Sequence, residues 1–415
     1  MKIEEFQFPS DWNLGHIAGW FDFTTKPRGL DLSKNGDEIP FFPMDQIPLG
    51  RIRVSEFTPK PLAQLGSGTY VENGDLMVAK ITPSFENGKQ AIVDIETDFA
   101  YATTEVIPMR GRNGESDTLF LFFYLLHPEV RSDLAGKMEG STGRQRLSKT
   151  VLGNRFIPLP PLPEQKKIAH ILSTVQRAIE VQERIIQTTT ELKKALMHKL
   201  FTEGLRNEPQ KQTEIGPVPE SWEVVPVGDI CRSIVPGRNK PKVFDGDIPW
   251  LTTPNIKGLD YINADVDGLR VSSDELKSSG GRMIPEKSVI MSRVGDFGVS
   301  AVTNIEIVIN QQLHAFVCPE NLNPVFLCNQ LRYRKPYMET IAAITTIPYL
   351  NKSKCESVPI ALPGRPEQDA VVKAFETLDS KRNQHIARQQ VLQDLFRTLL
   401  HELMTAKTRV HELTV

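Results

Sequence analysis

Two long stretches of the chain carry apolar residues at intervals of three and four positions, with polar residues between them. The first stretch occupies residues 157–206 and the second occupies residues 360–415. Such spacing places the apolar side chains on one face of an α-helix, and a helix of about 40 residues is about 60 Å long. Each stretch begins at prolines, which suit the first turn of a helix, so the pattern predicts two helices too long for the interior of one domain. The predicted apolar seam comprises Ile168, Leu172, Val175, Ile179, Ile186, Leu192, Leu196, Leu200, Val371, Phe375, Leu378, Ile386, Leu392, Phe396, Leu399 and Leu403.

The two stretches are degenerate copies of one another. Residues 157–204 align with residues 360–407 without a gap, and the Pro-Glu-Gln at 163–165 returns at 366–368. A repeated unit of this kind implies a duplicated architecture. Two narrow apolar seams of equal length favour pairing with each other, so we expect an antiparallel coiled coil. The alternative, two unrelated helices that each pack on a local domain, leaves the gapless match unexplained.

The segments between the long helices also repeat, with more divergence. The apolar run at 76–81 corresponds to that at 289–294, and each is followed by a glycine-containing turn and a second apolar run. A third run then precedes a short apolar helix, at 119–126 in one half and 325–331 in the other. Short strands combined with one helix predict an α/β domain in each half.

These elements predict a domain order that repeats once. We expect an α/β domain at 1–156, a long helix at 157–206, a second α/β domain at 207–359 and a second long helix at 360–415, with the polar segment 207–221 as a linker. Antiparallel pairing of the helices would relate the halves by an approximate two-fold axis and hold two similar domains at a fixed separation. DNA offers similar features at intervals of one or two helical turns, so this geometry favours a protein that binds two half-sites.

The composition is that of an ordinary soluble protein. The chain has 415 residues, of which 40% are hydrophobic and 24% are charged. It contains no apolar run of about 18 residues and no charged and then apolar leader at its start, so we expect a cytoplasmic protein that does not cross a membrane. The four cysteines lack CxxC or Cys/His spacing, which predicts neither a disulfide framework nor a metal site.

Basic residues are concentrated in two segments, although the net charge is only −2. Residues 140–155 and 231–242 each carry several Arg or Lys and no Asp or Glu. Arg and Gln can pair bidentately with guanine and adenine, and Arg and Lys bind phosphate. The candidate DNA-binding residues are Lys80, Arg144, Gln145, Arg146 and Lys149 in the first half, and Arg238, Lys240, Lys242, Arg293, Thr345, Thr346 and Asn351 in the second half. The alternatives are solvated loops, or turns that close each domain onto its helix.

Four short segments resemble parts of catalytic motifs, and each lacks the residues that would complete the motif. Residues 323–326 have one proline fewer than the loop with which amino-methyltransferases hold a flipped base, and we expect them to begin the short helix. Residues 296–298 lack the lysine strand and catalytic loop of a kinase, and residues 88–90 lack the Ser or Thr of a phosphate-binding loop. Residues 275–277 lack the upstream Asp of a magnesium-dependent nuclease site. The sequence therefore predicts no catalytic residue.

The sequence resembles the specificity subunit of a type I restriction–modification system over essentially its whole length. The resemblance rests on IPLPPLPEQKKIAHIL at 157–172, LKKALMHKLFTEG at 192–204, GPVPESWEVVPVGDI at 216–230 and the repeated Pro-Glu-Gln at 366–368. It implies two target-recognition domains, each reading one half of a bipartite, asymmetric double-stranded DNA target, and helices that set the spacer between the halves.

The resemblance also implies partners and cofactors. Two adenine-N6 methyltransferase subunits would dock on the helices and domains, and two ATP-dependent restriction and translocase subunits would complete the enzyme. S-adenosylmethionine, ATP and Mg²⁺ would bind those partners, and this chain would bind no cofactor and would be non-catalytic. The target adenine would be flipped out of the duplex into a pocket of the methyltransferase.

The sequence leaves two other hypotheses open. The chain could be a two-headed coiled-coil adaptor that binds proteins and has no DNA specificity, or a nuclease with an unrecognised site. Steeply salt-dependent DNA binding would distinguish a specificity subunit from the adaptor. Magnesium-dependent cutting by the purified chain alone would identify the nuclease.

Overall fold

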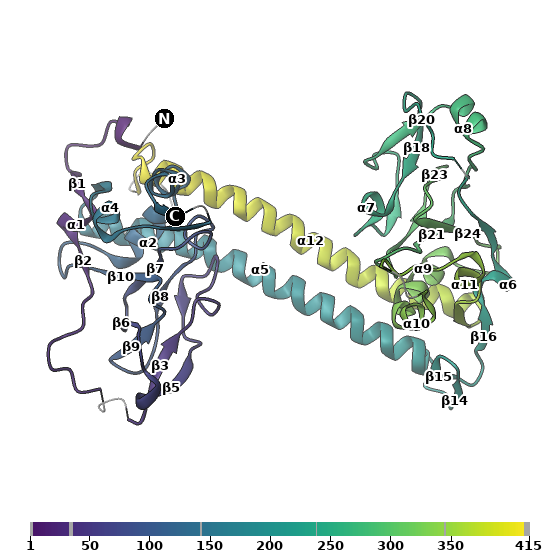
Figure 1. Cartoon of the computed structure of the whole chain (residues 1–415), viewed down its shortest axis with the longest axis horizontal. Helices are drawn as coiled ribbons and strands as arrows, with labels where there is room; N and C mark the ends of the chain where they lie inside the picture. The colour runs from purple at the N-terminus through teal and green to yellow at the C-terminus, as the bar shows by residue number, and fades with distance from the viewer. Residues whose placement is uncertain (1–2, 33–35, 142, 238, 344–345, 411–415) are drawn as a thin grey trace. The chain divides into compact units, whose positions relative to one another are not determined.

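The computed structural model describes residues 3–32, 36–141, 143–237, 239–343 and 346–410. The chain divides into two units, whose helices and strands are labelled in Figure 1. Met1–Ile186 and His385–Val415 form the first unit, and Gln187–Gln384 form the second. Each unit therefore contains one α/β domain and a part of each long helix.

The two predicted long helices are present. Helix α5 spans Leu162–Glu203 and helix α12 spans Arg365–Met404. Within the first unit the beginning of α5 packs against the end of α12, and within the second unit the end of α5 packs against the beginning of α12 (Figure 1). The helices pair antiparallel, so the predicted coiled coil is confirmed.

Most of the predicted seam is buried or half-buried. The buried members are Ile168, Leu172, Ile179, Leu200, Val371, Phe375 and Leu403, and the half-buried members are Val175, Ile186, Leu196, Leu378, Leu392, Phe396 and Leu399. The prediction was wrong for Leu192 and Ile386, which are 53% and 44% exposed. A pair of helices buries only the strip between them, and both side chains lie off that strip. In this region α5 and α12 also make polar contacts, such as that between His385 Nδ1 and Gln182 Oε1 at 2.7 Å.

Each domain is built on a five-stranded sheet with the same strand order. In the first domain the order is β2 (Phe21–Phe23), β10 (Val106–Gly111), β7 (Leu76–Ala79), β8 (Gln90–Val93) and β4 (Arg53–Val54). In the second domain it is β17 (Arg232–Ile234), β24 (Leu313–Val317), β21 (Ser288–Ser292), β22 (Ser300–Thr303) and β19 (Tyr261–Ile262). In both sheets only the last strand pairs parallel with its neighbour. The matching order confirms the α/β domains and the internal repeat.

A second sheet extends each domain. It is formed by β5 (Thr58–Pro61), β3 (Glu38–Phe42), β9 (Phe99–Ala102) and β6 (Thr69–Glu72) in the first domain, and by β20 (Leu269–Val271), β18 (Ile248–Leu251) and β23 (Val308–Ile309) in the second. Two further pairs of strands form separate hairpins. These are β11 (Glu139–Ser141) with β12 (Arg144–Arg146), and β14 (Gln210–Thr213) with β15 (Gly216–Pro219).

Each domain closes at the point where its long helix begins. Strand β1 (Asn13–His16) pairs with β13 (Phe156–Leu159), and β16 (Glu223–Pro226) pairs with β25 (Pro359–Leu362). In each pair the second strand runs directly into α5 or α12. The start of the domain is therefore hydrogen-bonded to the residues that lead into the helix, which fixes the direction in which the helix leaves the domain.

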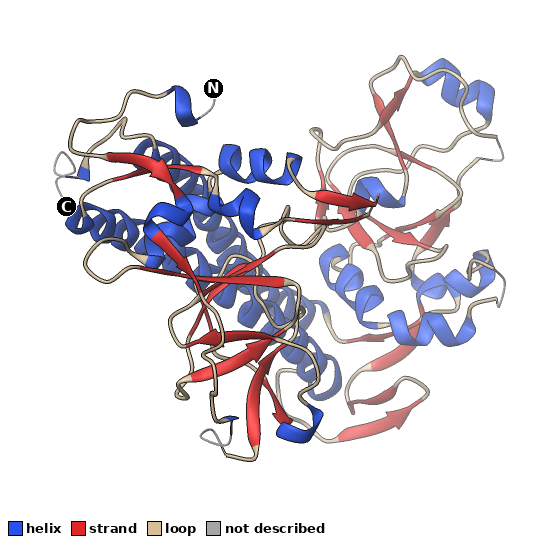
Figure 2. Ribbon diagram, turned by 60° about the vertical axis from the view of Figure 1, so that its left-hand side comes forward, coloured by secondary structure: helices blue, strands red, loops and turns tan. Residues whose placement is uncertain are grey.

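Short helices lie around the sheets (Figure 2). They are η1 (Ile3–Glu5), α1 (Ile17–Trp20), η3 (Leu62–Gln64), α2 (Thr118–Leu126), α3 (Pro128–Gly136) and α4 (Lys149–Gly153) in the first domain, and α6 (Val227–Ile230), α7 (Thr253–Ile256), α8 (Ser273–Ser279), α9 (Pro324–Tyr333), α10 (Lys335–Ile341) and α11 (Lys352–Glu356) in the second. The N-caps of α2 and α9 are Asp117 and Asn323, whose side chains accept backbone N–H groups of the first turn. Residues 323–326 therefore begin a helix, as the sequence predicted.

A buried glutamine fastens α5 to the first domain. The Oε1 atom of Gln165 accepts a hydrogen bond from the Asp117 N–H at 2.9 Å. Its Nε2 atom donates to the carbonyls of Pro160 and Glu115 at 2.8 and 3.1 Å. One side chain thus joins the start of the long helix to the start of α2 and satisfies backbone groups that burial removes from water.

The repeated glutamine does the same in the second unit. The Oε1 atom of Gln368 accepts from the Asn323 N–H at 2.8 Å. Its Nε2 atom donates to the carbonyls of Pro363 and Asn321 at 2.9 and 3.2 Å. The same three bonds at both helix starts give a physical reason for the recurrence of Pro-Glu-Gln in the sequence.

A histidine pair lies where the end of α12 meets the first domain. The Nε2 atom of His127 is 3.2 Å from Nδ1 of His401, and the two rings stack with centroids 5.5 Å apart. Burial lowers the pKa of His127 to about 4, and the nearby positive charges of His401 and Arg155 add to this effect. In the second unit Tyr333 takes the corresponding place, and its hydroxyl lies 2.7 Å from a histidine of α5.

Acid should weaken the contact between α12 and the first domain. Because the folded pKa of His127 lies below its ordinary value of 6.5, its contribution to stability is complete above that pH and is lost as the pH falls to about 4, a loss of about 3 kcal/mol. The variant His127→Tyr, which carries the residue of the second unit, should lose this part of the pH dependence. The measurement is the rate of amide hydrogen exchange in α2 as a function of pH, corrected for the intrinsic exchange rates. Helix α9, the counterpart of α2 in the second unit, is the internal control. An equal pH dependence in the variant would contradict this role of His127.

Candidate nucleic-acid interface

A basic edge lies at the end of β7 in the first domain. The Leu147 N–H donates to the Lys80 carbonyl at 2.7 Å, and the Thr82 N–H donates to the Gln145 carbonyl at 3.1 Å. These bonds attach the hairpin β11–β12 to the residues that follow β7. The structure therefore brings Lys80 together with β12, which carries three further predicted DNA-binding residues.

Only part of the charge at this edge is available to a ligand. Arg146 is held by Glu105 through contacts of 2.8 Å from Nη2 and 3.0 Å from Nε. These hydrogen bonds lower the pKa of Glu105 and raise the pKa of Arg146. Arg144 is exposed and has no ion-pair partner among the residues that the structure describes, and Lys149 is exposed in the first turn of α4. Arg144 and Lys149 are thus the charges most accessible to a ligand at this edge.

The last arginine of the basic segment 140–155 belongs to the core. Arg155 is 2% exposed and pairs with Glu4, Glu129 and Asp133 at 3.2, 2.9 and 2.8 Å. A buried guanidinium is tolerated because carboxylates surround it. The segment is therefore not one basic surface, because it combines an exposed hairpin with a buried anchor that the charge pattern alone does not reveal.

The second domain has the same edge with other side chains. The Leu350 N–H donates to the Arg293 carbonyl at 2.8 Å, so Arg293 takes the place of Lys80. Ile347 and Tyr349, which replace the two arginines of β12, are 59% and 43% exposed. The turn at this edge carries arginines in the first domain, whereas in the second it carries apolar and aromatic side chains beside Arg293.

Among the other candidates in the second half, Asn351 has a structural role. The side chain of Asn351 accepts the Lys354 N–H at 2.9 Å and caps α11. This is the structural role that the sequence left as the alternative for this turn. Thr346 is exposed, whereas Thr345 and Arg238 lie outside the described residues.

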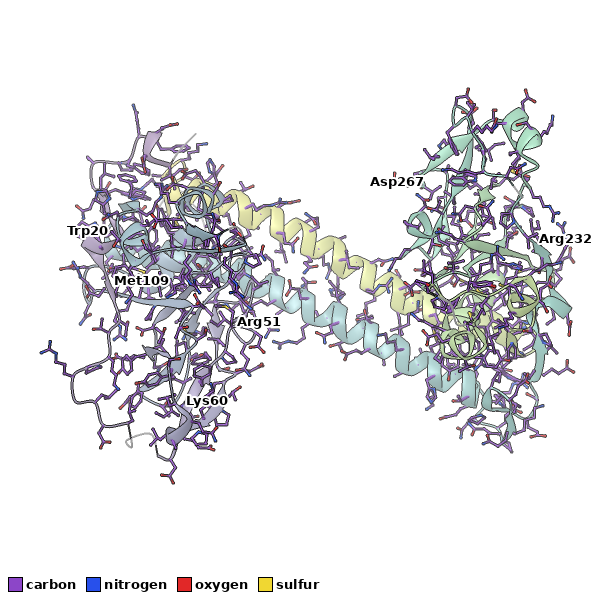
Figure 3. All side chains as sticks on the ribbon, in the orientation of Figure 1. Trp20, Arg51, Lys60, Met109, Arg232 and Asp267 are labelled. Atoms are coloured by element: carbon purple, nitrogen blue, oxygen red, sulfur yellow. The ribbon has the colours of Figure 1, made fainter. Side chains whose placement is uncertain are left out.

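An aromatic ring at the same position of both domains has a lysine over it, and the lysine comes from a different segment in each domain. Lys60 of β5 is 3.4 Å from the ring centroid of Phe41 in β3, and Lys240 is 5.6 Å from that of Trp250 in β18. Figure 3 labels Lys60 in the second sheet of the first domain. The sequence did not point to Lys60, because the prolines on both sides of it conceal the strand. The pairing of β3 with β5, which places lysine and ring together, becomes visible only in the fold.

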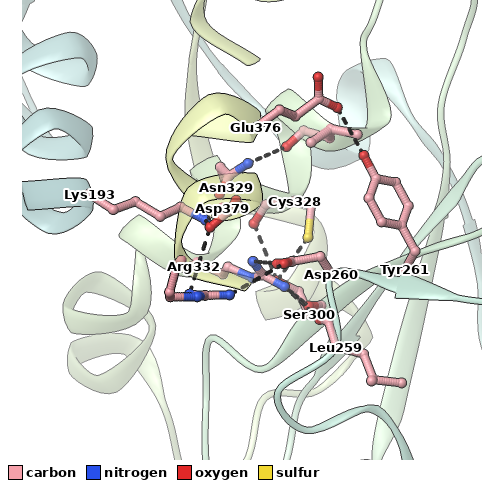
Figure 4. Close-up of polar contacts among 12 residues, drawn as sticks. Lys193, Leu259, Asp260, Tyr261, Ser300, Cys328, Asn329, Arg332, Glu376 and Asp379 are labelled. Atoms are coloured by element: carbon pink, nitrogen blue, oxygen red, sulfur yellow. Dashed lines mark hydrogen bonds and ion pairs between the residues drawn. The ribbon is translucent and has the colours of Figure 1, made fainter. Parts of the chain in front are cut away.

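A charged network joins the second domain to both long helices (Figure 4). Lys193 of α5 contacts Asp379 of α12 at 2.6 Å, and Arg332 of α9 contacts Asp260 at 2.5 Å. Arg382 lies 3.7 Å from Asp379 and 3.9 Å from Asp260. Burial acts to raise the pKa of Asp260, but the bond from Arg332 and the surrounding cations lower it. A cavity of about 460 Å³ opens beside this network.

The corresponding junction of the first domain relies on an amide. Gln176 of α5 donates from Nε2 to the Gly50 carbonyl. Gly50 and Gly258 have positive φ angles of 73° and 83°, a conformation that glycine adopts without strain in these two junction loops. Ion pairs are screened by salt more strongly than amide hydrogen bonds. The ion pairs at the junction of the second domain should therefore weaken more with ionic strength than the Gln176–Gly50 hydrogen bond does.

The comparisons with known proteins agree with this duplicated architecture. A family model described as the type I restriction modification DNA specificity domain matches twice, at residues 9–191 and 219–392. The chain belongs to this family.

Relatives and solved structures match three quarters or more of the chain. The MjaVIII specificity subunit of a type I restriction enzyme from Methanocaldococcus jannaschii is 26% identical over 75% of both chains. A protein of the same organism named for the MjaX specificity subunit is 25% identical over 99% of this chain and 96% of its own. The type I restriction–modification S subunit from M. genitalium matches with a TM-score of 0.58 at 15% identity over 96% of both chains. A structure of a type I restriction–modification system matches with the same score at 18% identity, over 96% of this chain and 99% of its own.

Two negative findings apply to the described part of the chain. It holds no group of three or more His, Cys, Asp or Glu side chains that could bind a metal ion. None of its helices combines the length and the apolar character that crossing a membrane requires.

Proposed function

We propose that this chain is the DNA specificity subunit of a type I restriction–modification enzyme. Each α/β domain reads one half of a bipartite, asymmetric target, and the paired helices set the spacer. The observation that most directly supports this function is that both domains share one strand order but carry different side chains at the edge beside Lys80 or Arg293. At that edge the hairpin β11–β12 of the first domain corresponds to residues 346–349 of the second. One frame used twice provides two reading domains, and unlike edges provide unlike half-sites.

Base and phosphate contacts come from different side chains. In the first domain Gln145 offers the bidentate geometry that adenine accepts, and Lys80, Arg144 and Lys149 supply positive charge for phosphates. Glu105 fixes the guanidinium of Arg146, which limits it to one orientation toward a base edge.

The second domain uses a different set of cations. Lys240 and Lys242 bind phosphate, and Arg293 contacts a base or a phosphate. Arg293 is half-buried at the end of its core strand, and its Nε donates to the Gln311 carbonyl at 2.8 Å, so its position is fixed before DNA arrives.

The chemistry takes place on partner subunits, and this chain acts without catalysis of its own. Two adenine-N6 methyltransferase subunits dock on the helices and domains and bring S-adenosylmethionine. Two restriction and translocase subunits use ATP and Mg²⁺. The target adenine leaves the base stack to enter a pocket of the methyltransferase, so this chain needs only to position the duplex. The complex works in the cytoplasm, where the DNA is.

Methylation mapping tests this function. When the chain is produced with its neighbouring methyltransferase subunit, N6-methyladenine should occur in host DNA at a two-part motif with a non-specific gap, and only when this chain is present. Exchange of residues 1–156 for the corresponding domain of another specificity subunit should change one half of the motif and leave the other. A stable complex that methylates no such motif would favour the protein-binding adaptor instead.

Arg144 should contribute to DNA affinity through its charge. In the complex with the methyltransferase, Arg144→Ala should weaken DNA binding and reduce the slope of log K against log salt by about 0.9, the change expected for one phosphate contact. Arg112 is the control. It follows the last residue of β10, at the end opposite to Glu105, and it pairs with Asp22 at 2.9 Å. Arg112→Gln should leave the slope unchanged, and equal slopes for Arg144→Ala and the wild type would exclude this contact.

A further inference from the structure

A polar cleft in the second domain is formed by an element that the described part of the first domain lacks. Helix α8 follows β20, whereas in the first domain only the short 3-10 helix η3 follows the corresponding strand β5. The cleft between α8 and the segment before β18 has a volume of about 620 Å³. Its lining residues are Asn239, Lys240, Lys242, Glu275, Ser278 and Ser279. Two domains that share a frame and read different half-sites must differ where they read, so an element present in only one of them is a candidate reading surface.

Glu275 connects the two walls of this cleft. Its Oε1 atom accepts the backbone N–H of Lys242 at 2.5 Å, and the Ser278 hydroxyl lies 3.4 Å from its Oε2 atom. A carboxylate offers about four acceptor positions, so these contacts leave room for a further donor. Glu275 is half-buried as a residue, and the hydrogen bond from Lys242 holds its carboxylate against the opposite wall.

Positive charge flanks the carboxylate. Lys240 and Lys242 are exposed at the mouth of the cleft. The ammonium of Lys240 is also held over the rings of Trp250 and Phe244, at 5.6 and 5.9 Å. The cleft therefore presents one fixed acceptor beside two cations, an arrangement that suits a base edge next to its phosphates.

We propose that this cleft reads a C·G base pair in the half-site of the second domain. Glu275 accepts a hydrogen bond from the N4 amino group of cytosine in the major groove, and Lys240 and Lys242 hold the adjacent phosphates. This assignment rests on the function proposed above, and it adds Glu275 as a residue that determines specificity.

The electrostatics of the bases explain why a carboxylate selects cytosine. In the major groove thymine presents O4 and guanine presents O6 and N7, all acceptors that repel a carboxylate. Adenine places the acceptor N7 beside its amino group, whereas cytosine presents the donor alone. Glu275 therefore favours cytosine, repels thymine and guanine, and meets both a donor and a repelling acceptor on adenine; discrimination by repulsion is a common source of specificity.

Methylation mapping of Glu275 variants, made as the full chain with its methyltransferase subunit, tests this assignment. The wild-type motif should contain a C·G pair in the half-site that persists when residues 1–156 are exchanged. In Glu275→Gln that position should shift toward A·T, because a carboxamide both accepts from N6 and donates to N7 of adenine. The preference for cytosine should fall by about tenfold, which is within the discrimination that one good base contact provides. In Glu275→Ala the position should become degenerate.

Asp274→Asn is the matched control, because it removes the same charge from the same helix at a side chain that is 97% exposed. It should leave the motif unchanged, and the first half-site should stay unchanged in every variant, which shows that each complex is folded and active. A wild-type half-site without a C·G pair, or an unaltered motif in both Glu275 variants, would overturn the assignment. A wild-type complex that directs no two-part motif would instead overturn the proposed function, and the assignment with it.

Discussion

The buried glutamines at the starts of the long helices are the contacts on which the structure of each unit depends. A helix that leaves a domain must bury backbone groups at the junction, and an unpaired group there costs about 1–3 kcal/mol. Gln165 and Gln368 satisfy three such groups each, on the strand exit before the helix and on the turn before α2 or α9. The domain and the helix are thereby joined as one body. Side chains at the edge of a sheet are then held at a fixed position relative to the long helix of the same unit.

The duplication separates what holds the fold from what distinguishes the two halves. The two domains share their strand order, the glutamine anchors and an aromatic ring, in β3 or β18, that has a lysine over it. The two domains differ at the edge beside Lys80 or Arg293, at the junction with the long helices, and in helix α8, which belongs to the second domain. Shared features cannot give two domains different sequence preferences. The differing features are therefore where specificity is expected, and they are also the places where the chain departs most from its own repeat.

The long helices and the repeat could be predicted because they depend on local periodicity and on a gapless match. The α/β class followed from short apolar runs, and residues 323–326 were correctly assigned to a helix start. Features that depend on contacts distant in sequence could not be predicted. The charge of Arg155 is cancelled by three carboxylates from two other segments, and the β3–β5 pairing that places Lys60 over Phe41 leaves no local pattern. Leu192 and Ile386 fit the helical period but lie off the buried strip. The assignment of individual side chains to DNA stays a prediction.

The role of the helices as a spacer is the central claim, and a change in helix length tests it most directly. Seven residues would be inserted into α5 at Thr188–Thr190 and seven into the facing turn of α12 at Lys381–Gln384, between the Gln182–His385 and Lys193–Asp379 contacts. The insertion lengthens the pair by about 10 Å, which corresponds to about three base pairs of DNA. Methylation mapping should then show the same two half-sites with a spacer longer by that amount. An unchanged spacer, or an altered half-site, would contradict the account.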